Sequence, residues 1–143
     1  MAEENETLMH RWFEEVWNQG REEAIDEMFA EDGLAYGLPT MSGEPIRGTK
    51  DFKIFFRQFR EAFPNIKVSV EDSIRDGDKI VTRCSVKGSL EGESLRISPA
   101  NQPVDFTGMV IARIENGKIA EAWNEWDFMT MYSQLGVLSL DLK

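Results

Sequence analysis

The sequence predicts an α+β fold in which helices pack on one face of a curved, mainly antiparallel sheet. Before Pro64, apolar residues recur every three or four positions, which is the spacing of helix faces. After Pro64 they alternate every second position, as in strands with one buried face. Asn116-Gly117 separates two such alternating runs, which is the strongest short-range signal for a β-hairpin. Helices followed by a run of strands are typical of α+β folds.

Two helices are expected at the N-terminus. In the first, apolar residues at steps of three and four form one face, and Gly20 is a natural helix end. A second, short helix is predicted over residues 21–29, with a turn at residues 31–33 after it. The apolar face of the first helix consists of Leu8, Met9, Trp12, Phe13, Val16 and Trp17.

A third helix is expected after a short strand at residues 34–38 and a loop at residues 39–48. Thr49 is a suitable N-cap, and Pro64 ends the helix because a proline disfavours helical geometry in the residue before it. Phenylalanines at helical spacing mark the inner face, and such a stripe is more often core than a ligand cage. They are Phe52, Phe55, Phe56, Phe59 and Phe63.

The second half of the chain is predicted to form a strand meander. Residues 88–99 are either a short hairpin arm or a loop, and the apolar tail at residues 137–143 is left unassigned. Long strands joined by hairpins twist and coil, so a sheet covered by helices on one side makes a cone with a pocket at its mouth. Strands are expected at residues 66–75, 79–88, 103–115 and 118–127, followed by a short helix at 128–135.

Length, charge and cysteine usage limit the class of protein. The chain has 143 residues and no linker or repeat, so we expect a single domain over residues 1–143. Its formal net charge of −10 argues against nucleic acid and anionic membrane as partners, since both need a basic face. We find no signal peptide and no apolar run of membrane length. Cys84 is the only cysteine and cannot pair within the chain, which favours a reducing, cytoplasmic location.

The end of the last predicted strand carries the residues most suited to chemistry. Trp123 and Trp126 are interleaved there with Asn124, Glu125 and Asp127, which donate or accept protons or hydrogen bonds. Asp127 has two interpretations of about equal weight. It is a general acid/base whose pKa is raised by burial among aromatic rings, or it is the N-cap of the next helix.

Only one face of this strand can look into the fold, because side chains alternate. In one register the odd-numbered residues from Ile119 to Asp127 face inward, which places Glu125 about 6.6 Å from Asp127 along the strand. In the other register the even-numbered residues face inward, with Asn124 as the polar anchor and the carboxylates in solvent. We prefer the odd register, because the apolar Ile119 then shares the inner face.

Three further side chains are candidates for substrate contacts. Arg83 interrupts the alternation of a predicted strand, and it either holds a substrate oxygen or pairs with an acid. Tyr36 either directs its hydroxyl into the pocket or is an ordinary half-buried tyrosine. Met109 fills a gap in the core or the pocket. No residue cluster has metal-ligand spacing and no Gly-rich phosphate loop precedes a helix, so we expect neither metal nor cofactor.

Short segments spread along the chain match, in order, those of a known group. The chain resembles the SnoaL-like polyketide cyclase, or ester cyclase, branch of the NTF2-like superfamily. The resemblance covers nearly the whole chain, and it is carried by the combination rather than by any one segment. The segments are EEVWNQG at 14–20, AFP at 62–64, GDKIVTR at 77–83, FTG at 106–108, RIENGKI at 113–119, EAW at 121–123, Asp127, and QLG at 134–136.

The resemblance implies a cone-shaped fold and intramolecular aldol chemistry that needs no metal or organic cofactor. In that family an aspartate on the strand matching residues 118–127 acts as acid/base, aided by a histidine, and the matching aspartate here is Asp127. The chain departs from the pattern, because its only histidine is His10 in the first helix. Positions where many relatives have histidine hold Leu90 and Ala122.

These observations predict a cyclase, isomerase or hydrolase without metal, acting on a small apolar molecule with a carbonyl group. The alternative is a module that binds a small ligand or a partner without chemistry, because the same fold serves both purposes. A carboxylate inside the pocket favours the enzyme, whereas carboxylates capped or salt-bridged outside favour the binding module. We also expect a homodimer through the outer face of the sheet, which must meet either water or a partner.

Overall fold

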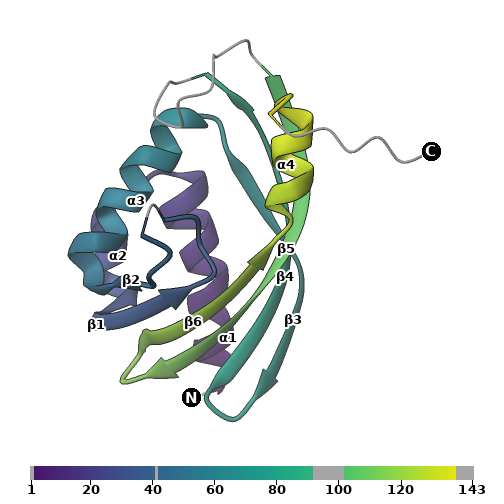
Figure 1. The fold of residues 1–143 in the computed structure, drawn as a ribbon. Coiled ribbons are helices and arrows are strands. Elements are labelled where there is room, and N and C mark those ends of the chain that lie inside the picture. The colour runs from purple at the N-terminus through teal and green to yellow at the C-terminus, as the bar shows by residue number, and fades with distance from the viewer. Residues whose placement is uncertain (1, 41, 92–101, 138–143) are drawn as a thin grey trace.

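The computed structural model describes residues 2–40, 42–91 and 102–137. Helices lie on the concave side of one curved sheet, which confirms the predicted α+β class (Figure 1). The helical elements are α1 (Ala2–Arg11), η1 (Trp12–Asn18), α2 (Glu23–Met28), α3 (Gly48–Ala62) and α4 (Phe128–Gln134). The strands are β1 (Phe29–Tyr36), β2 (Ile46–Arg47), β3 (Lys67–Asp76), β4 (Lys79–Leu90), β5 (Gln102–Glu115) and β6 (Lys118–Trp126).

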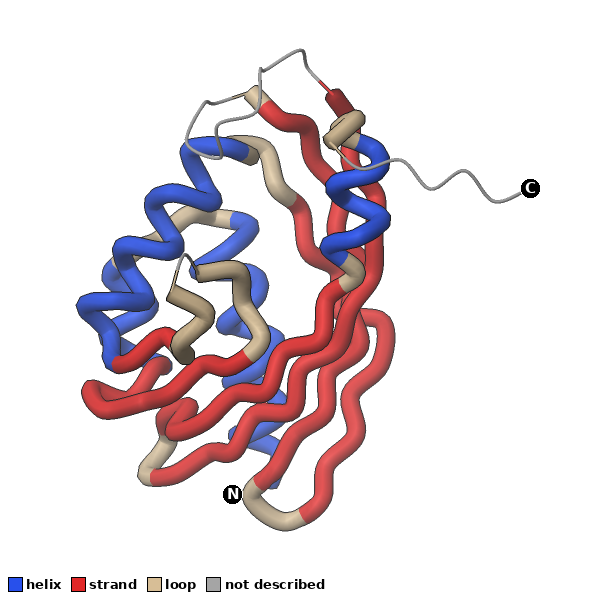
Figure 2. The backbone as a smooth tube through the Cα atoms, viewed as in Figure 1, coloured by secondary structure: helices blue, strands red, loops and turns tan. Residues whose placement is uncertain are grey.

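The six strands form one sheet in the order β2-β1-β6-β5-β4-β3. β1 and β6 are parallel, and every other neighbouring pair is antiparallel. The hairpin between β5 and β6 turns at Asn116 and Gly117, as predicted (Figure 2). Their φ values of 52° and 75° are both positive, as a type I′ turn requires.

The predicted first helix is α1 followed without a break by η1, a π-helical segment. Its predicted apolar face is buried, including Trp12, Phe13 and Trp17. A π-helical turn is wider than an α-helical one and is frequent at functional sites. Gly20 ends the segment with a φ of 72°, as the sequence indicates.

The region after α2 differs from the prediction. The turn expected at residues 31–33 lies inside β1, which begins at Phe29. The pairing of β1 with β6 shifts register between Phe29 and Leu34, so the polar residues form an irregularity within a strand rather than a turn. The loop expected at residues 39–48 contains the short edge strand β2. β4 extends to Leu90. Most of the rest of residues 88–99, which were expected to form either a hairpin arm or a loop, lies outside the described residues.

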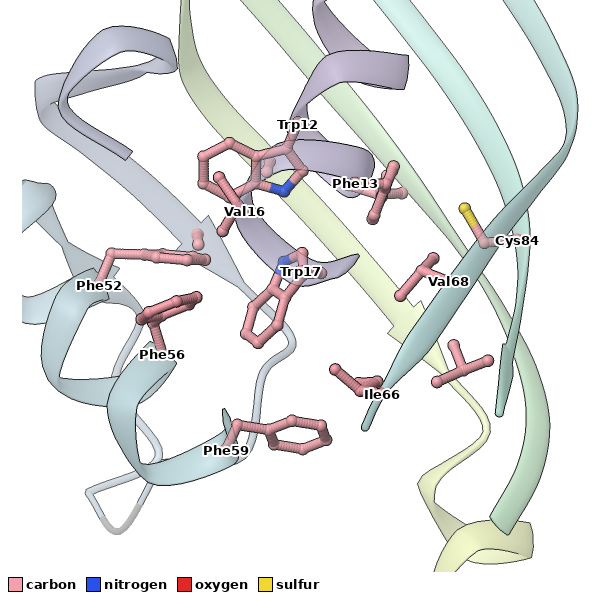
Figure 3. Packing of buried hydrophobic residues seen from close by; sticks show 14 of the residues in the cluster. Trp12, Phe13, Val16, Trp17, Phe52, Phe56, Phe59, Ile66, Val68 and Cys84 are labelled. Carbon is pink, nitrogen blue, oxygen red and sulfur yellow. The ribbon is translucent and has the colours of Figure 1, made fainter. Parts of the chain in front are cut away.

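The phenylalanine stripe of α3 faces η1 across the concave side of the sheet. Figure 3 shows Trp17 among the rings of Phe52, Phe56 and Phe59. The centroid of the Trp17 ring lies 5.5 Å from that of Phe56 and 5.8 Å from that of Phe59. These separations are typical of favourable aromatic pairs. Among the described helices, none has the length and apolar character needed to span a bilayer.

Candidate functional site

An apolar cavity lies between the concave side of the sheet and the helices. Its lining comes from α1, η1, α3, α4, five of the strands and two residues between elements, Leu38 and Ile66. Asn124 is the single amide among the lining side chains, and the others are aliphatic, aromatic or thioether groups. The lining consists of Met9, Trp12, Phe13, Trp17, Phe29, Ala35, Leu38, Phe52, Phe55, Phe59, Ile66, Val68, Val86, Phe106, Val110, Ile119, Ala122, Asn124, Trp126 and Phe128.

The cavity is narrow. Its walls bound about 680 Å³ when the open mouth is included, and about 70 Å³ of that is wide enough for the centre of a water molecule. One water needs roughly 10–15 Å³ by this measure, so the interior has room for several waters or a small apolar molecule.

Asn124 is held in a fixed orientation on β6. Its Nδ2 donates a hydrogen bond to the Tyr36 carbonyl oxygen at 3.0 Å. Its Oδ1 accepts one from Nε1 of Trp126, also at 3.0 Å. A carboxamide has two N–H donors and two acceptor positions, so these bonds use half of its capacity. The other half remains to be satisfied by solvent or a ligand.

Two glycines make room for this arrangement. Gly37, which follows β1, has a φ of 84°, and a Cβ there would lie 2.0 Å from the Asn124 carbonyl oxygen, so only glycine allows the chain to pass so close to β6. A Cβ on Gly108 would lie 2.2 Å from Cε3 of Trp126. The Trp126 ring therefore lies directly over Gly108 of β5, and Trp126 forms part of the cavity wall.

The prediction that the odd-numbered residues at the end of β6 face inward is wrong. The even-numbered residues from 122 to 126 face inward instead. Ala122, Asn124 and Trp126 line the cavity. Trp123 lies on the outer face, stacked on Tyr36 with ring centroids 5.9 Å apart and the rings 14° from parallel. Glu125 is exposed. Trp123, Glu125 and Tyr36, all predicted to contact substrate, thus lie away from the cavity.

Asp127 caps α4 instead of lining the cavity. Its Oδ1 accepts a hydrogen bond from the Thr130 backbone N–H at 3.0 Å, and its Oδ2 accepts one from the Thr130 hydroxyl at 2.6 Å. These bonds from the Thr130 side chain and backbone lower the pKa of Asp127. The prediction of a raised pKa is therefore wrong, because the carboxylate is exposed and accepts two hydrogen bonds. The N-cap interpretation is confirmed.

Arg83 and Met109 also lie on the outer face. The Arg83 guanidinium contacts the Asp72 carboxylate at 2.7 Å, and both side chains are exposed. Of the two roles predicted for Arg83, the structure therefore shows pairing with an acid. Met109 is half exposed beside it. Neither lines the cavity, so of the predicted contact residues only Asn124 and Trp126 do so.

The lining limits the chemistry available inside the cavity. None of the described side chains that line it titrates in the physiological range. No group of three or more potential metal ligands occurs in the described part of the chain. What the walls offer is an apolar surface, aromatic faces and a fixed amide. Such walls can hold an apolar molecule, and the amide has an N–H that can donate a hydrogen bond to an oxygen.

Sequence reasoning treated the phenylalanines of α3 as core, yet Phe52, Phe55 and Phe59 also line the cavity. Periodicity identifies the inward face of a helix but not whether the facing space is filled. Gly37 and Gly108 were missed because their role depends on a neighbouring strand. Within a strand, an isolated glycine such as Gly108 is the signal that can indicate close backbone approach.

The sequence profile of SnoaL-like polyketide cyclases matches residues 7–135. No curated protein matches the chain. Among solved structures, a SnoaL-like protein from Jannaschia sp. CCS1 has a TM-score of 0.85 at 20% identity, over 96% of this chain and 95% of that one. At this identity the similarity establishes the shared NTF2-like fold alone.

Two other solved structures are more similar in sequence. IdmH from Streptomyces antibioticus, a candidate polyketide cyclase, has 27% identity and a TM-score of 0.80, over 93% of this chain and 99% of that one. A candidate polyketide cyclase from Bacillus cereus has 29% identity and a TM-score of 0.78, over 95% of this chain and 83% of that one.

Proposed function

Because the chain belongs to the SnoaL-like polyketide cyclase family, we propose that its cavity binds a small, flat, mostly apolar molecule that carries a carbonyl oxygen. The observation behind the proposal is the composition of the cavity wall, which is apolar except for the fixed amide of Asn124. Apolar pockets with a small number of placed polar groups are typical of small-molecule sites. The aromatic side chains of the wall offer faces against which a flat ring system stacks.

Asn124 supplies the polar contact in this proposal. Its second Nδ2 hydrogen donates to a ligand carbonyl, while the bonds to Tyr36 and Trp126 keep the amide plane fixed. An amide held in place before the ligand arrives loses little side-chain entropy on binding. A ligand without an oxygen leaves this N–H without a partner in a water-poor site, so the cavity favours carbonyl compounds.

Binding is the leading candidate because the wall lacks an acid or base. The enzyme hypothesis depended on Asp127 or Glu125 inside the cavity with a raised pKa. Both carboxylates are exposed, and the pKa of Asp127 is lowered. Carboxylates outside the cavity are what a binding module without chemistry predicts.

Intramolecular ring closure is a second candidate, supported by the family assignment. In an aldol closure a carbon acid loses a proton, the resulting carbanion attacks a carbonyl carbon of the same molecule, and the new alkoxide takes up a proton. A narrow cavity promotes this step by holding the two carbons together, and Asn124 donates to the oxygen that becomes negative. The proposed base is Asp127. Its carboxylate has to break its hydrogen bonds with Thr130 before it can accept a proton from the substrate.

The binding proposal is tested by calorimetric titration with two probes, 2-acetylnaphthalene and its carbonyl-free analogue 2-ethylnaphthalene. We expect saturable binding of both, tighter for the ketone. Ala122→Leu fills the cavity, whereas Ala120→Leu makes the same change on the same strand outside the lining. The first variant should lose binding and the second should retain it, with circular dichroism confirming that both fold. Equal affinity in the two variants contradicts a site in this cavity.

A further inference from the structure

Two buried hydroxyl groups, those of Ser73 and Thr82, lie side by side on the inner face of the sheet. The two residues are paired between β3 and β4. Thr82 is 0% exposed, and the Ser73 Oγ is also shielded from solvent. Neither oxygen has a hydrogen-bond partner among the described residues. A buried hydroxyl without a partner is costly and uncommon, so an adjacent pair indicates a place that binds a further polar group.

Thr82 lies one strand beyond the wall of the apolar cavity. It pairs with Val110 of β5, and Val110 in turn pairs with Asn124 of β6. Both of these partners line the cavity. Val86, four residues along β4 from Thr82, lines it as well, and β4 pairs with β5 in one continuous register, so Thr82 faces the same side. Asn124, Val110, Thr82 and Ser73 therefore form one row across four strands of the inner face.

Apart from Ser73, the neighbours of Thr82 along the inner face of β4 are weakly polar or apolar. Ile80 and Cys84 are the preceding and following inward residues, and both are buried. The Cys84 side chain is directed toward Phe13 of η1, a residue of the cavity wall (Figure 3). A thiol is a weak hydrogen-bonding group. In the described part of the row, Thr82 and Ser73 therefore have only each other as strong partners.

We propose that Thr82 and Ser73 form a second polar subsite, which a ligand reaches by extending the cavity along this row. The inference rests on the binding function proposed above. Met9 is the residue that α1 contributes to the described cavity wall, and α1 packs against β3 and β4, so Met9 borders the cavity on the side of Thr82. A methionine side chain is unbranched and flexible, so a ligand can displace it without moving the backbone.

The spacing of the two polar groups defines the class of ligand. Asn124 and Thr82 are two strands apart, which is roughly 10 Å. Val110 lies between them, so an apolar scaffold spans this interval. A carbonyl at one end of the ligand accepts from Asn124, and a hydroxyl at the other end donates to the Thr82 Oγ1. The Thr82 hydroxyl can then donate to Ser73, since hydrogen bonds between such residues form across paired strands.

Calorimetric titration with two naphthyl ketones tests the subsite. 6-Acetyl-2-naphthol carries a hydroxyl at the end opposite to its acetyl group, and 2-acetylnaphthalene is the same molecule without it. The naphthol should bind the wild-type chain about three- to tenfold more tightly, which is the net effect of one hydrogen bond. Equal affinity of the two ketones overturns the subsite and leaves the cavity proposal standing. Binding of neither ketone overturns both.

Thr82→Val assigns the gain in affinity to this hydroxyl, because valine keeps the branched shape and removes the oxygen. The ratio of the two Kd values should fall to about one in this variant. Thr107→Val is the matched control, since Thr107 is an exposed threonine of β5 that is absent from the cavity wall. It should keep the wild-type ratio, and circular dichroism checks that both variants fold. A wild-type ratio in Thr82→Val contradicts the subsite.

Thermal unfolding of the ligand-free protein gives a second, independent readout. A hydroxyl without a partner contributes nothing to stability when it is buried, so the Tm of Thr82→Val should equal or exceed that of the wild type. A lower Tm for Thr82→Val than for Thr107→Val shows that the Thr82 hydroxyl is already bonded in the free protein. That result overturns the subsite even if the cavity binds both ketones.

Discussion

The indole of Trp126 lies over Gly108, its partner on the neighbouring strand. The two residues are paired between β5 and β6, and a Cβ on Gly108 would approach Cε3 of Trp126 to 2.2 Å. Real contacts of this kind do not occur, so the absent side chain of Gly108 is what lets the ring occupy its place in the cavity wall. From there its Nε1 donates to Asn124.

Gly108→Ala should therefore displace the indole, break its hydrogen bond to Asn124 and change the shape of the cavity. Overpacking of this kind costs about 1–3 kcal/mol, which thermal unfolding detects as a lower Tm. Trp126 emission should change as well. Gly88→Ala is the control, because its Cβ would come no closer than 3.4 Å to Cα of Ile66. Equal Tm changes in the two variants contradict the role assigned to Gly108.

Asn124→Leu should reduce both stability and ligand selectivity. The change keeps the approximate shape but leaves the Tyr36 carbonyl and the Trp126 N–H without their partner. Leaving a buried polar group unsatisfied costs roughly 1–3 kcal/mol. The affinity for 2-acetylnaphthalene should fall toward that for 2-ethylnaphthalene, measured by calorimetry on the folded variant. A preserved preference for the ketone indicates that the carbonyl contacts another group.

The sequence predicted the architecture because apolar periodicity reports which face of an element is buried. It did not predict the register of β6, and the reason lies in one added residue. Ile114 pairs with Ile119, whereas Arg113 pairs with Glu121, so Ala120 is left without a partner. Both Ile119 and Ala122 therefore face inward, three positions apart. Strict alternation counted from Ile119 gives the opposite face, and no local pattern marks the irregularity.

Asp127 illustrates a second limit. An aspartate that follows a strand and precedes a helix suits both a cap and a cavity acid, and the residue types alone do not distinguish them. The two hydrogen bonds from Thr130 hold the Asp127 carboxylate in the N-cap position. Thr130 three positions after Asp127 is the sequence signal that favours the cap, because its hydroxyl can donate to the N-cap carboxylate in addition to the backbone N–H at that spacing.

Substitutions at Asp127 separate capping from catalysis. Asparagine is as good an N-cap as aspartate, whereas alanine is poor. If Asp127 only caps α4, Asp127→Asn should keep the Tm and the affinity for 2-acetylnaphthalene, and Asp127→Ala should lower the Tm. Thermal unfolding and calorimetry check this. Once a turnover assay exists, loss of turnover in a stably folded Asp127→Asn protein establishes the acid/base role and refutes capping as the only function.

Stability should fall in acid because ion pairs lower carboxylate pKa values in the folded state. A hydrogen bond from Arg11 is the main cause at Glu15, and one from Arg57 is the main cause at Glu22. A lowered folded pKa contributes stability above the unfolded value of 4.5, and this is lost as the pH falls through the folded value. Urea midpoints should therefore be flat near neutral pH and decrease below about pH 4.5.

Arg57→Gln should reduce this acid sensitivity, because the pKa of Glu22 then returns toward its ordinary value. The effect should be modest and should shrink in high salt, since the pair is partly exposed and screened by ions. Arg75→Gln removes the same charge from an exposed position on β3 and serves as the control. A parallel pH profile for the two variants contradicts the assignment of the shift to Arg57.

Cys84 provides a probe of how tightly the sheet closes over the cavity. Burial raises the pKa of its thiol to about 12, so almost no reactive thiolate is present at pH 8. Iodoacetamide should therefore label the native protein slowly and the urea-unfolded protein completely, as followed by mass spectrometry. A ligand that binds only the folded chain lowers the population of opened molecules, so 2-acetylnaphthalene should slow the labelling further. Rapid native labelling contradicts the burial of Cys84, whereas slow labelling that the ketone leaves unchanged shows that the opening at β4 is independent of the cavity.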